Sequence, residues 1–491
     1  MLEQLAAGKT LPALVDDETF FRRASFDLTG KLPKPEQIHR FLSDSAADKR
    51  AKLVDRLLQS DDYAVNWGRY WRDAVLYHTP ASGNYIRWQL FDRWWADQFR
   101  RNRRWDEVVT ALVTATGVND ECAPVNYLTG MFGNPTEIAA TTSRIFLGVQ
   151  IQCAECHNAK TEPWKREQFH ELAAFFGRAR IIQHKDVGGR GTPYAIEGRS
   201  EGQYRMTDKR NPDHLIPMQP RFLTGESVPA DAPDDVRRSA LARFMTSPEN
   251  PWFARCFVNR MWTCLMGWGF YPTVNDLAAH VTPRHPKVLD LLAHAWTASG
   301  YDVQWLLGTI ALTRAYQRPV QAPRYTSSEN ILPEVCPVRL RPEQIFEALQ
   351  TALGFDENEK GIPAPAPNTA PALQRHTGLR NMVYMAFREN PSLPLNEVHG
   401  KIPQALLLMN SVLVHKFASA DGKTVLAELL GKGLNDEQVV AALYQRILAR
   451  KATVEELSTC QRYIAKVGSR KEALEDVAWG LVNTTEFLIK K

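Results

Sequence analysis

Hydrophobic residues recur at intervals of three and four through most of this chain, which is the period of helices with one buried face. A clear example begins at Asn134, a typical cap, with a proline at the first helical position and Glu137 at the third. The residues that follow on one face are Ile138, Thr142, Ile145, Val149 and Cys153. We therefore predict a helix that starts at Pro135 and carries these five positions up to Cys153.

The same pattern predicts further helices downstream. One should run from Pro163 to about Phe176, where Gly177 can end it. Its inward-facing residues are expected to be Phe169, Leu172, Ala173 and Phe176. Near the C-terminus, Asn435 precedes one periodic series, and Thr453 with Glu456 forms a capping box before the next. The C-terminal part is therefore expected to be a small helical bundle.

The helical period disappears between about Arg178 and Gly225, where glycines and prolines separate short extended pieces. We interpret this segment as irregular and partly β. Linkers are expected at 317–337 and at 361–371, the second rich in alanine and proline. The predicted fold class is mainly α, with two helical domains that cover residues 1–225 and 226–491.

The composition excludes several classes of protein. The 491 residues are 44% hydrophobic and 23% charged, which is enough chain to bury large cores and excludes a disordered or fibrous protein. The net charge of +5 is too small and too scattered to indicate nucleic-acid binding. A basic run at 100–104 is interpreted as the solvated end of a helix. No apolar stretch is long enough to span a membrane.

The termini and the cysteines limit the cellular setting. Residues 1–9 lack the basic, apolar and small-residue parts of a secretory signal, which predicts either an intracellular protein or a form without its signal. The seven cysteines are too few and too widely spaced for a disulfide scaffold. Each cysteine is therefore considered separately.

The strongest chemical signal is Cys153-Ala154-Glu155-Cys156-His157, a C-x-x-C-H run of the kind that attaches c-type haem. Two thiols at this spacing can reach the two vinyl groups of a porphyrin, and the adjacent histidine can reach the iron. We predict covalent haem c at Cys153, Cys156 and His157, with His157 as the proximal iron ligand. The other ring nitrogen of His157 is expected to be held by a carbonyl or a carboxylate.

Three other interpretations of this run stay open. It could be half of a zinc site, although His170, His184 and His214 downstream do not form a second ligand pair. It could be a dithiol redox pair, although the helices predicted on both sides are not the β-α-β setting of such pairs. It could also be two small buried residues at the end of a helix, with no cofactor at all.

The sixth iron position is not fixed by the sequence. Met218, in a downstream loop, would raise the potential and favour electron transfer. His170, His184 or His214 would instead give a bis-histidine iron of lower potential. An empty position would favour small-ligand binding or catalysis. Met218 and His170 also fit simple packing roles.

Aromatic and polar clusters are expected to be structural. Six tryptophans lie close together at Trp67, Trp71, Trp88, Trp94, Trp95 and Trp105. Their helical spacing predicts core, although such crowding can also mark a carbohydrate-binding platform. Asn259, Arg260, Asp276 and His285 belong to a polar patch that could be a site but is interpreted as a buried hydrogen-bonded network that fixes helix packing. The chain has no standard hydrolase, nucleotide-binding or metalloprotease motif.

These motifs together resemble a known pair of domains. The C-x-x-C-H run, preceded by Phe146-Leu147-Gly148 and followed by Glu162-Pro163-Trp164, resembles the planctomycete cytochrome-like domain of unknown function. Phe21-Arg22-Arg23 resembles the opening of that domain. Asn250-Pro251-Trp252 and Pro403-Gln404-Ala405-Leu406-Leu407 resemble the planctomycete-specific domain, also of unknown function, that usually follows it.

The resemblance implies an exported protein, periplasmic or secreted, with a small cytochrome as its redox partner. Many members carry a second histidine two residues after the motif, where this chain has Ala159. A cysteine-rich segment before Pro403 is replaced here by 396–400, which weakens the case for a second metal site.

We therefore expect a c-type haem protein that acts in electron transfer or haem-based redox chemistry. The alternative is an exported module without haem that binds polysaccharide or a partner protein, with a structural or zinc-binding C-x-x-C-H run. Hydrolysis of a surface glycan is a third hypothesis, for which the sequence offers no catalytic carboxylate pair.

Overall fold

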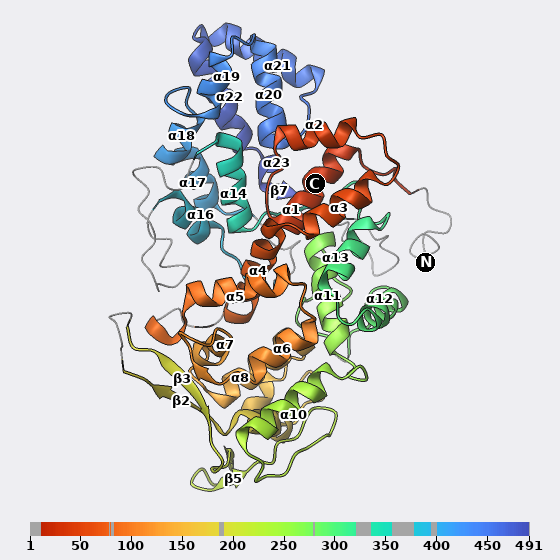
Figure 1. Ribbon diagram of the computed structural model, residues 1–491, viewed down its shortest axis with the longest axis vertical. Coiled ribbons are helices and arrows are strands. Elements are labelled where there is room, and N and C mark those ends of the chain that lie inside the picture. Colours follow the sequence, from red (N-terminus) through yellow and green to blue (C-terminus); the bar gives the residue numbers. More distant parts are fainter. Residues whose placement is uncertain are drawn as a thin grey trace.

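The computed structural model describes residues 11–77, 79, 83–185, 191–277, 280–320, 335–355, 378–393 and 400–490. The described chain is mainly α, as predicted, and its strands form small antiparallel sheets of two or three strands (Figure 1). The predicted linker at 361–371 lies outside the described residues, as does most of the linker at 317–337. Within the described ranges, no helix is both long and apolar enough to cross a membrane.

The first half of the chain is built mainly of helices. In chain order they are α1 (Asp17–Thr29), α2 (Pro35–Ser43), α3 (Lys49–Leu58), α4 (Asp61–Leu76), α5 (Trp88–Arg100), α6 (Trp105–Val113), α7 (Val125–Gly130), α8 (Pro135–Thr142) and α9 (Arg166–Ala173). Of these, α4 is the longest and packs on α1, α3, α5 and α7. The predicted helix start at Asn134 is confirmed, because its side chain accepts a hydrogen bond from the Thr136 N–H. The second predicted helix is α9, which begins at Arg166 and continues as a 3₁₀ turn to Phe176.

The segment between 178 and 225 contains strands, as predicted, and lies at one end of the molecule (Figure 1). Three strands pair in the order β1-β3-β2, with bounds β1 (Gly117–Val118), β2 (Ala179–Gln183) and β3 (Tyr194–Gly198). A separate hairpin pairs β4 (Arg205–Thr207) with β5 (Leu215–Pro217) and places Met206 opposite Ile216. This hairpin forms one wall of the candidate site described below.

The second half of the chain is also built mainly of helices. They are α10 (Asp234–Thr246), α11 (Phe253–Met266), α12 (Pro286–Ala298), α13 (Val303–Leu312), α14 (Pro342–Leu353), α16 (Leu379–Phe387), α17 (Ile402–Asn410), α18 (Val412–Ala418), α19 (Val425–Gly431), α20 (Asp436–Leu448), α21 (Val454–Val467), α22 (Arg470–Val482) and α23 (Thr485–Leu488). The C-terminal bundle is confirmed, with the predicted caps at Asn435 and Thr453. A short sheet pairs β6 (Val338–Arg339) with β7 (Ile489–Lys490).

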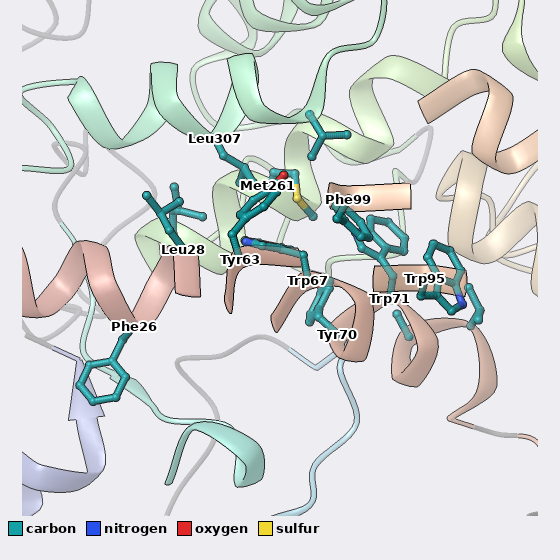
Figure 2. Close-up of a cluster of buried hydrophobic side chains, with 14 of the residues drawn as sticks. Phe26, Leu28, Tyr63, Trp67, Tyr70, Trp71, Trp95, Phe99, Met261 and Leu307 are labelled. Carbon is teal, nitrogen blue, oxygen red and sulfur yellow. The ribbon is translucent and has the colours of Figure 1, made fainter. Parts of the chain in front are cut away.

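The crowded tryptophans are core, as predicted. Trp67, Trp71 and Trp95 lie on α4 and α5 among other buried aromatic rings (Figure 2). Trp71 stacks on Phe257 of α11, with ring centroids 5.6 Å apart and ring planes 3° apart. Aromatic side chains of the two halves therefore share one core. The domain boundary near residue 225 stays a prediction.

The predicted polar network around α11 is present at Asn259 and Arg260, whereas Asp276 and His285 are only half-buried. The Asn259 side chain donates to the Val274 carbonyl and accepts from the Tyr271 N–H. The buried guanidinium of Arg260 donates to Tyr70 Oη at 3.0 Å and lies over the Trp71 ring. The Arg260 bond connects α11 to α4, while Arg260 Nε and Nη2 are buried without a hydrogen-bond partner in the described part of the chain.

Candidate functional site

The C-x-x-C-H run lies beyond the helix that was expected to contain its first cysteine. Helix α8 ends at Thr142 and continues as a π turn over Ser143–Leu147, after which Gly148 adopts a left-handed φ of 65°. A Cβ atom at Gly148 would lie 2.4 Å from Leu277 Cδ1. The prediction of one helix up to Cys153 is therefore wrong: the helix ends at left-handed Gly148, whose carbonyl accepts a hydrogen bond from the Leu277 N–H of the second half.

After this turn, the cysteines and the histidine of the C-x-x-C-H run are exposed, while residues between and before them are buried. Gln152–Glu155 forms a 3₁₀ turn. Ile151, just before this turn, and Ala154, within it, are fully buried. These two side chains anchor the turn on the core. Cys153 and Cys156 are exposed free thiols. The structure thus presents both sulfurs to solvent, rather than packing them at a helix end.

His157 is exposed, and its ring is oriented by the backbone. The distance from His157 Nδ1 to the Asn158 carbonyl oxygen is 2.8 Å. Because a carbonyl only accepts hydrogen bonds, Nδ1 carries the hydrogen in this contact and the neutral ring has its lone pair on Nε2. A carbonyl was the partner expected for a metal-ligating histidine at this position.

An open hollow of about 480 Å³ lies against His157. Its apolar lining comes from Met206 and Ile216 of the β4–β5 hairpin. Its polar lining consists of Asn158, Lys160, Arg166, Glu167, Asp208, Lys209 and Arg210. The hollow is therefore neither a flat apolar slot nor filled by side chains packed on the histidine ring, and it has a basic rim.

One acidic group on this rim is held in its charged form. The Arg210 backbone N–H and the His214 side chain form hydrogen bonds with the Asp208 carboxylate, and they lower its pKa. Four cationic side chains line the same hollow, against the carboxylates of Asp208 and Glu167. The hollow can consequently attract a ligand that carries carboxylates.

His170 holds the C-x-x-C-H turn through a hydrogen bond to its backbone. Its Nε2 lies 3.1 Å from the Glu155 carbonyl oxygen, and its Nδ1 lies 2.8 Å from Tyr204 Oη. Burial lowers the pKa of His170 and raises the pKa of Tyr204, so the ring is neutral and donates from Nε2 while the tyrosine hydroxyl donates to Nδ1. Both ring nitrogens are engaged, so an iron-ligand role for His170 would require breaking one of these bonds.

Met218 lies in a small cluster next to this support. It is 6% exposed and packs with Ala174 and Met206, against Tyr204 and Ile216. Met218 is not among the residues that line the hollow, whereas Met206 is. The sequence analysis missed Met206, because no local pattern distinguishes a methionine in a short strand. Its proximity to His157 depends on the folding of the hairpin.

The other expected ligands are on the surface. His184 lies 4.0 Å from Glu197 and His214 lies 3.3 Å from Asp208, each as an exposed side chain. Among the residues that the structure describes, no group of three or more His, Cys, Asp or Glu side chains is arranged to hold a metal ion. A zinc site at Cys153 and Cys156 would therefore need ligands from elsewhere.

The loop after the motif is attached to the second half of the chain. Glu162 Oε1 lies 2.9 Å from His280 Nδ1, and the Trp164 ring packs edge-to-face on Trp252 at 5.9 Å. The Ala159 N–H donates to the Trp164 carbonyl at 2.9 Å and closes the loop. The candidate site is therefore positioned by both halves.

The fold and the site define a mainly helical protein with a solvent-exposed C-x-x-C-H turn. Residues 2–180 match the family model PSCyt2, a protein of unknown function (DUF1549). Residues 237–464 match PSD1, a protein of unknown function (DUF1553). Both domains expected from the resemblance are therefore matched, in the expected order. No curated protein and no solved structure matches it.

Proposed function

We propose that this protein carries one covalent c-type haem on Cys153, Cys156 and His157 and acts in electron transfer. The observation that carries the proposal is the combination of two exposed free thiols with a histidine whose Nδ1 is held by a carbonyl. This combination fits the group, because both sulfurs are accessible and the lone pair on His157 Nε2 is available for iron.

Each residue has a defined role in this proposal. Cys153 and Cys156 would hold the haem as thioethers: each thiol would add across one vinyl group, with the sulfur on one carbon and the hydrogen on the other. No oxidant or reductant is consumed. His157 Nε2 would bind the iron, while the Asn158 carbonyl keeps the ring oriented. Bound haem would supply one-electron exchange between ferric and ferrous iron.

The hollow beside His157 supports the same proposal. Lys160, Arg166, Lys209 and Arg210 are suited to pair with the two carboxylates that a haem carries. Met206 and Ile216 offer an apolar surface on the same wall. The basic rim also favours an acidic redox partner, for which a small cytochrome is the candidate implied by the family resemblance.

The sixth iron position belongs to the proposal as well. Met206 would be the first candidate because it lines the same hollow as His157, and a thioether bound to the iron would raise the potential. Met218 is the second choice, since it packs on Met206 from outside the hollow lining. His170 ranks below both, because its two ring nitrogens already have partners.

The alternative function, polysaccharide or protein binding without haem, has less support. The tryptophans that suggested a carbohydrate platform are buried in the core or packed against it. Zinc at the same cysteines lacks further ligands within the described ranges. Location outside the cytoplasm, periplasmic or secreted, is proposed from the family resemblance.

The test is a pyridine haemochrome spectrum of protein produced together with c-type haem maturation proteins. We expect a Soret band and one haem per chain. A Cys153→Ser/Cys156→Ser variant should contain none, whereas Cys122→Ser, which changes a half-buried thiol outside the motif, should match the wild type. A wild-type spectrum without haem, or equal haem in the double variant, would overturn the proposal.

A further inference from the structure

A second cavity lies between the two halves of the chain, away from the hollow beside His157. Its volume is about 100 Å³. A single water needs about 10–15 Å³ on the same measure, so the space can hold several waters or a ring-sized molecule. Trp67, Tyr70 and Tyr77 of the first half line it together with Arg339, Arg341 and Arg388 of the second half. Figure 2 shows Trp67 and Tyr70 side by side on α4.

Some charged groups of this cavity neutralise one another. Lys490 Nζ lies 2.5 Å from Asp27 Oδ1, and both side chains are buried. Asp73 Oδ1 lies 2.7 Å from the Arg72 guanidinium, which is also buried. In these pairs the charges of Lys490, Asp27 and Asp73 are already balanced by protein groups, so none of the three needs a ligand.

Two further carboxylates line the cavity: Glu343, which lies 3.9 Å from the Arg72 guanidinium, and Glu389, which pairs with Arg339. The guanidinium groups of Arg341 and Arg388 have no such partner, because no carboxylate of the described ranges forms an ion pair with either of them. Arg341 donates to the Asn66 side chain and lies over the Tyr70 ring. Arg388 lies between the Tyr77 and Tyr384 rings, with its Cζ 4.8 Å and 5.7 Å from their centroids, and its buried Nε has no hydrogen-bond partner.

Arg339 has a largely buried side chain. Its side chain is 9% exposed, and its Nε and Nη1 atoms have no hydrogen-bond partner within the described part of the chain. Its nearest carboxylate, Glu389, lies 3.4 Å from Arg339 and 2.8 Å from Lys401, so this carboxylate is shared between two cations. Burying a guanidinium with unsatisfied N–H groups costs free energy unless a further acceptor is present.

The aromatic residues that line the cavity indicate which group the ligand should have besides its hydrogen-bond acceptor. Trp67, Tyr70, Tyr384 and Phe387 give the cavity aromatic faces around the arginines. Aromatic rings pack well on flat rings, and arginine N–H groups bind planar or tetrahedral oxyanions in bidentate fashion. A bare inorganic anion would leave the aromatic walls without a partner.

We propose that this cavity binds a small organic anion, whose carboxylate or sulfate group pairs with Arg339, Arg341 and Arg388 and whose ring packs on the aromatic walls. The site needs both halves of the chain, because each contributes one side of the cavity. The proposal is independent of haem.

Isothermal titration calorimetry with small probes tests the proposal. Benzoate and phenyl sulfate represent the two oxyanions, benzamide is the neutral counterpart of benzoate, and inorganic sulfate lacks the ring. We expect at least one aromatic anion to bind about tenfold or more tighter than benzamide and than inorganic sulfate. Equal affinity of the charged and neutral aromatic probes would overturn the proposal. Which aromatic anion binds more tightly identifies the oxyanion.

Variants locate the binding site. Arg388→Gln should weaken the anion by about tenfold or more, and Arg388→Lys should lose less, because it keeps the charge. Arg462→Gln, an exposed arginine on α21, is the matched control and should bind like the wild type. The Cys153→Ser/Cys156→Ser variant should also bind normally. Unchanged affinity in folded Arg388→Gln would contradict the assignment.

Hydrogen exchange of the wild type provides a test without substitution. The bound aromatic anion should slow exchange of backbone amides in 338–344 and 384–391, which contain most of the arginine-bearing wall. Protection elsewhere, with none in these segments, would refute the site even if the variants failed to fold.

Discussion

Lys490 Nζ lies 2.5 Å from Asp27 Oδ1, with the two side chains only 4% and 6% exposed. The lysine also donates to the Leu265 carbonyl at 3.0 Å, and Tyr316 Oη donates to Asp27 Oδ2 at 2.6 Å. The pair therefore joins the end of the chain to α1 and α11. Its charges are balanced inside the protein, so removing one of them leaves the other uncompensated.

We predict that Lys490→Met lowers the free energy of unfolding by about 3–5 kcal/mol, because a buried Asp27 carboxylate loses its partner. The double variant Lys490→Met/Asp27→Asn should lose less than the sum of the two single changes. Urea unfolding measures both. Lys471→Met breaks the exposed pair with Asp421 and should change little. Additive losses in the double variant would show that the pair is not coupled.

Gly148 is predicted to be essential for the turn before the C-x-x-C-H run. Gly148→Ala should lower the free energy of unfolding by about 2–5 kcal/mol, because it adds left-handed strain and an overlap with Leu277. Gly433→Ala is the matched control, since Gly433 has a φ of +68° but open space around it, and it should lose only about 1–2 kcal/mol. Equal losses would mean that the Leu277 contact does not determine the turn.

The His170 support predicts a specific pH dependence. Burial lowers the pKa of His170 below its ordinary value of 6.5, so the unfolded chain binds its proton more readily than the folded one. Above pH 6.5, neutral His170 makes its full contribution to the free energy of unfolding. This contribution is lost as the pH falls below 6.5. From about pH 7.5 to about pH 5.5, the wild type should therefore lose more stability than His170→Gln.

Urea unfolding at the two pH values checks this prediction. Tyr204→Phe should lower the stability at both pH values, because it removes the donor to His170 Nδ1. An equal pH dependence in the wild type and His170→Gln would contradict the neutral, doubly bonded histidine described above.

The elements that the sequence predicted well have local causes. Asn134, Asn435 and Thr453 accept hydrogen bonds from backbone N–H groups two or three residues ahead, so their signals are complete within one turn. The mainly α fold and the tryptophan core follow from the same short-range periodicity. The C-x-x-C-H run was visible because all its residues are adjacent.

The features that the sequence did not predict have distant causes. The hydrophobic series through Val149 and Cys153 continues past Gly148, but the helix ends there in a left-handed residue whose carbonyl accepts from the distant Leu277 N–H. Met206 lies beside the hollow of His157 only because β4 pairs with β5. The arginine cavity likewise combines residues from both halves, and no spacing along the chain indicates it.

The most direct measurement of the central claim is the mass of one tryptic peptide. Cleavage after Arg144 and Lys160 releases residues 145–160, which contain Cys153, Cys156 and His157. From protein matured with c-type haem machinery, we predict this peptide at its own mass plus one haem, with neither cysteine open to alkylation. An unmodified peptide that takes up two alkyl groups would contradict the account.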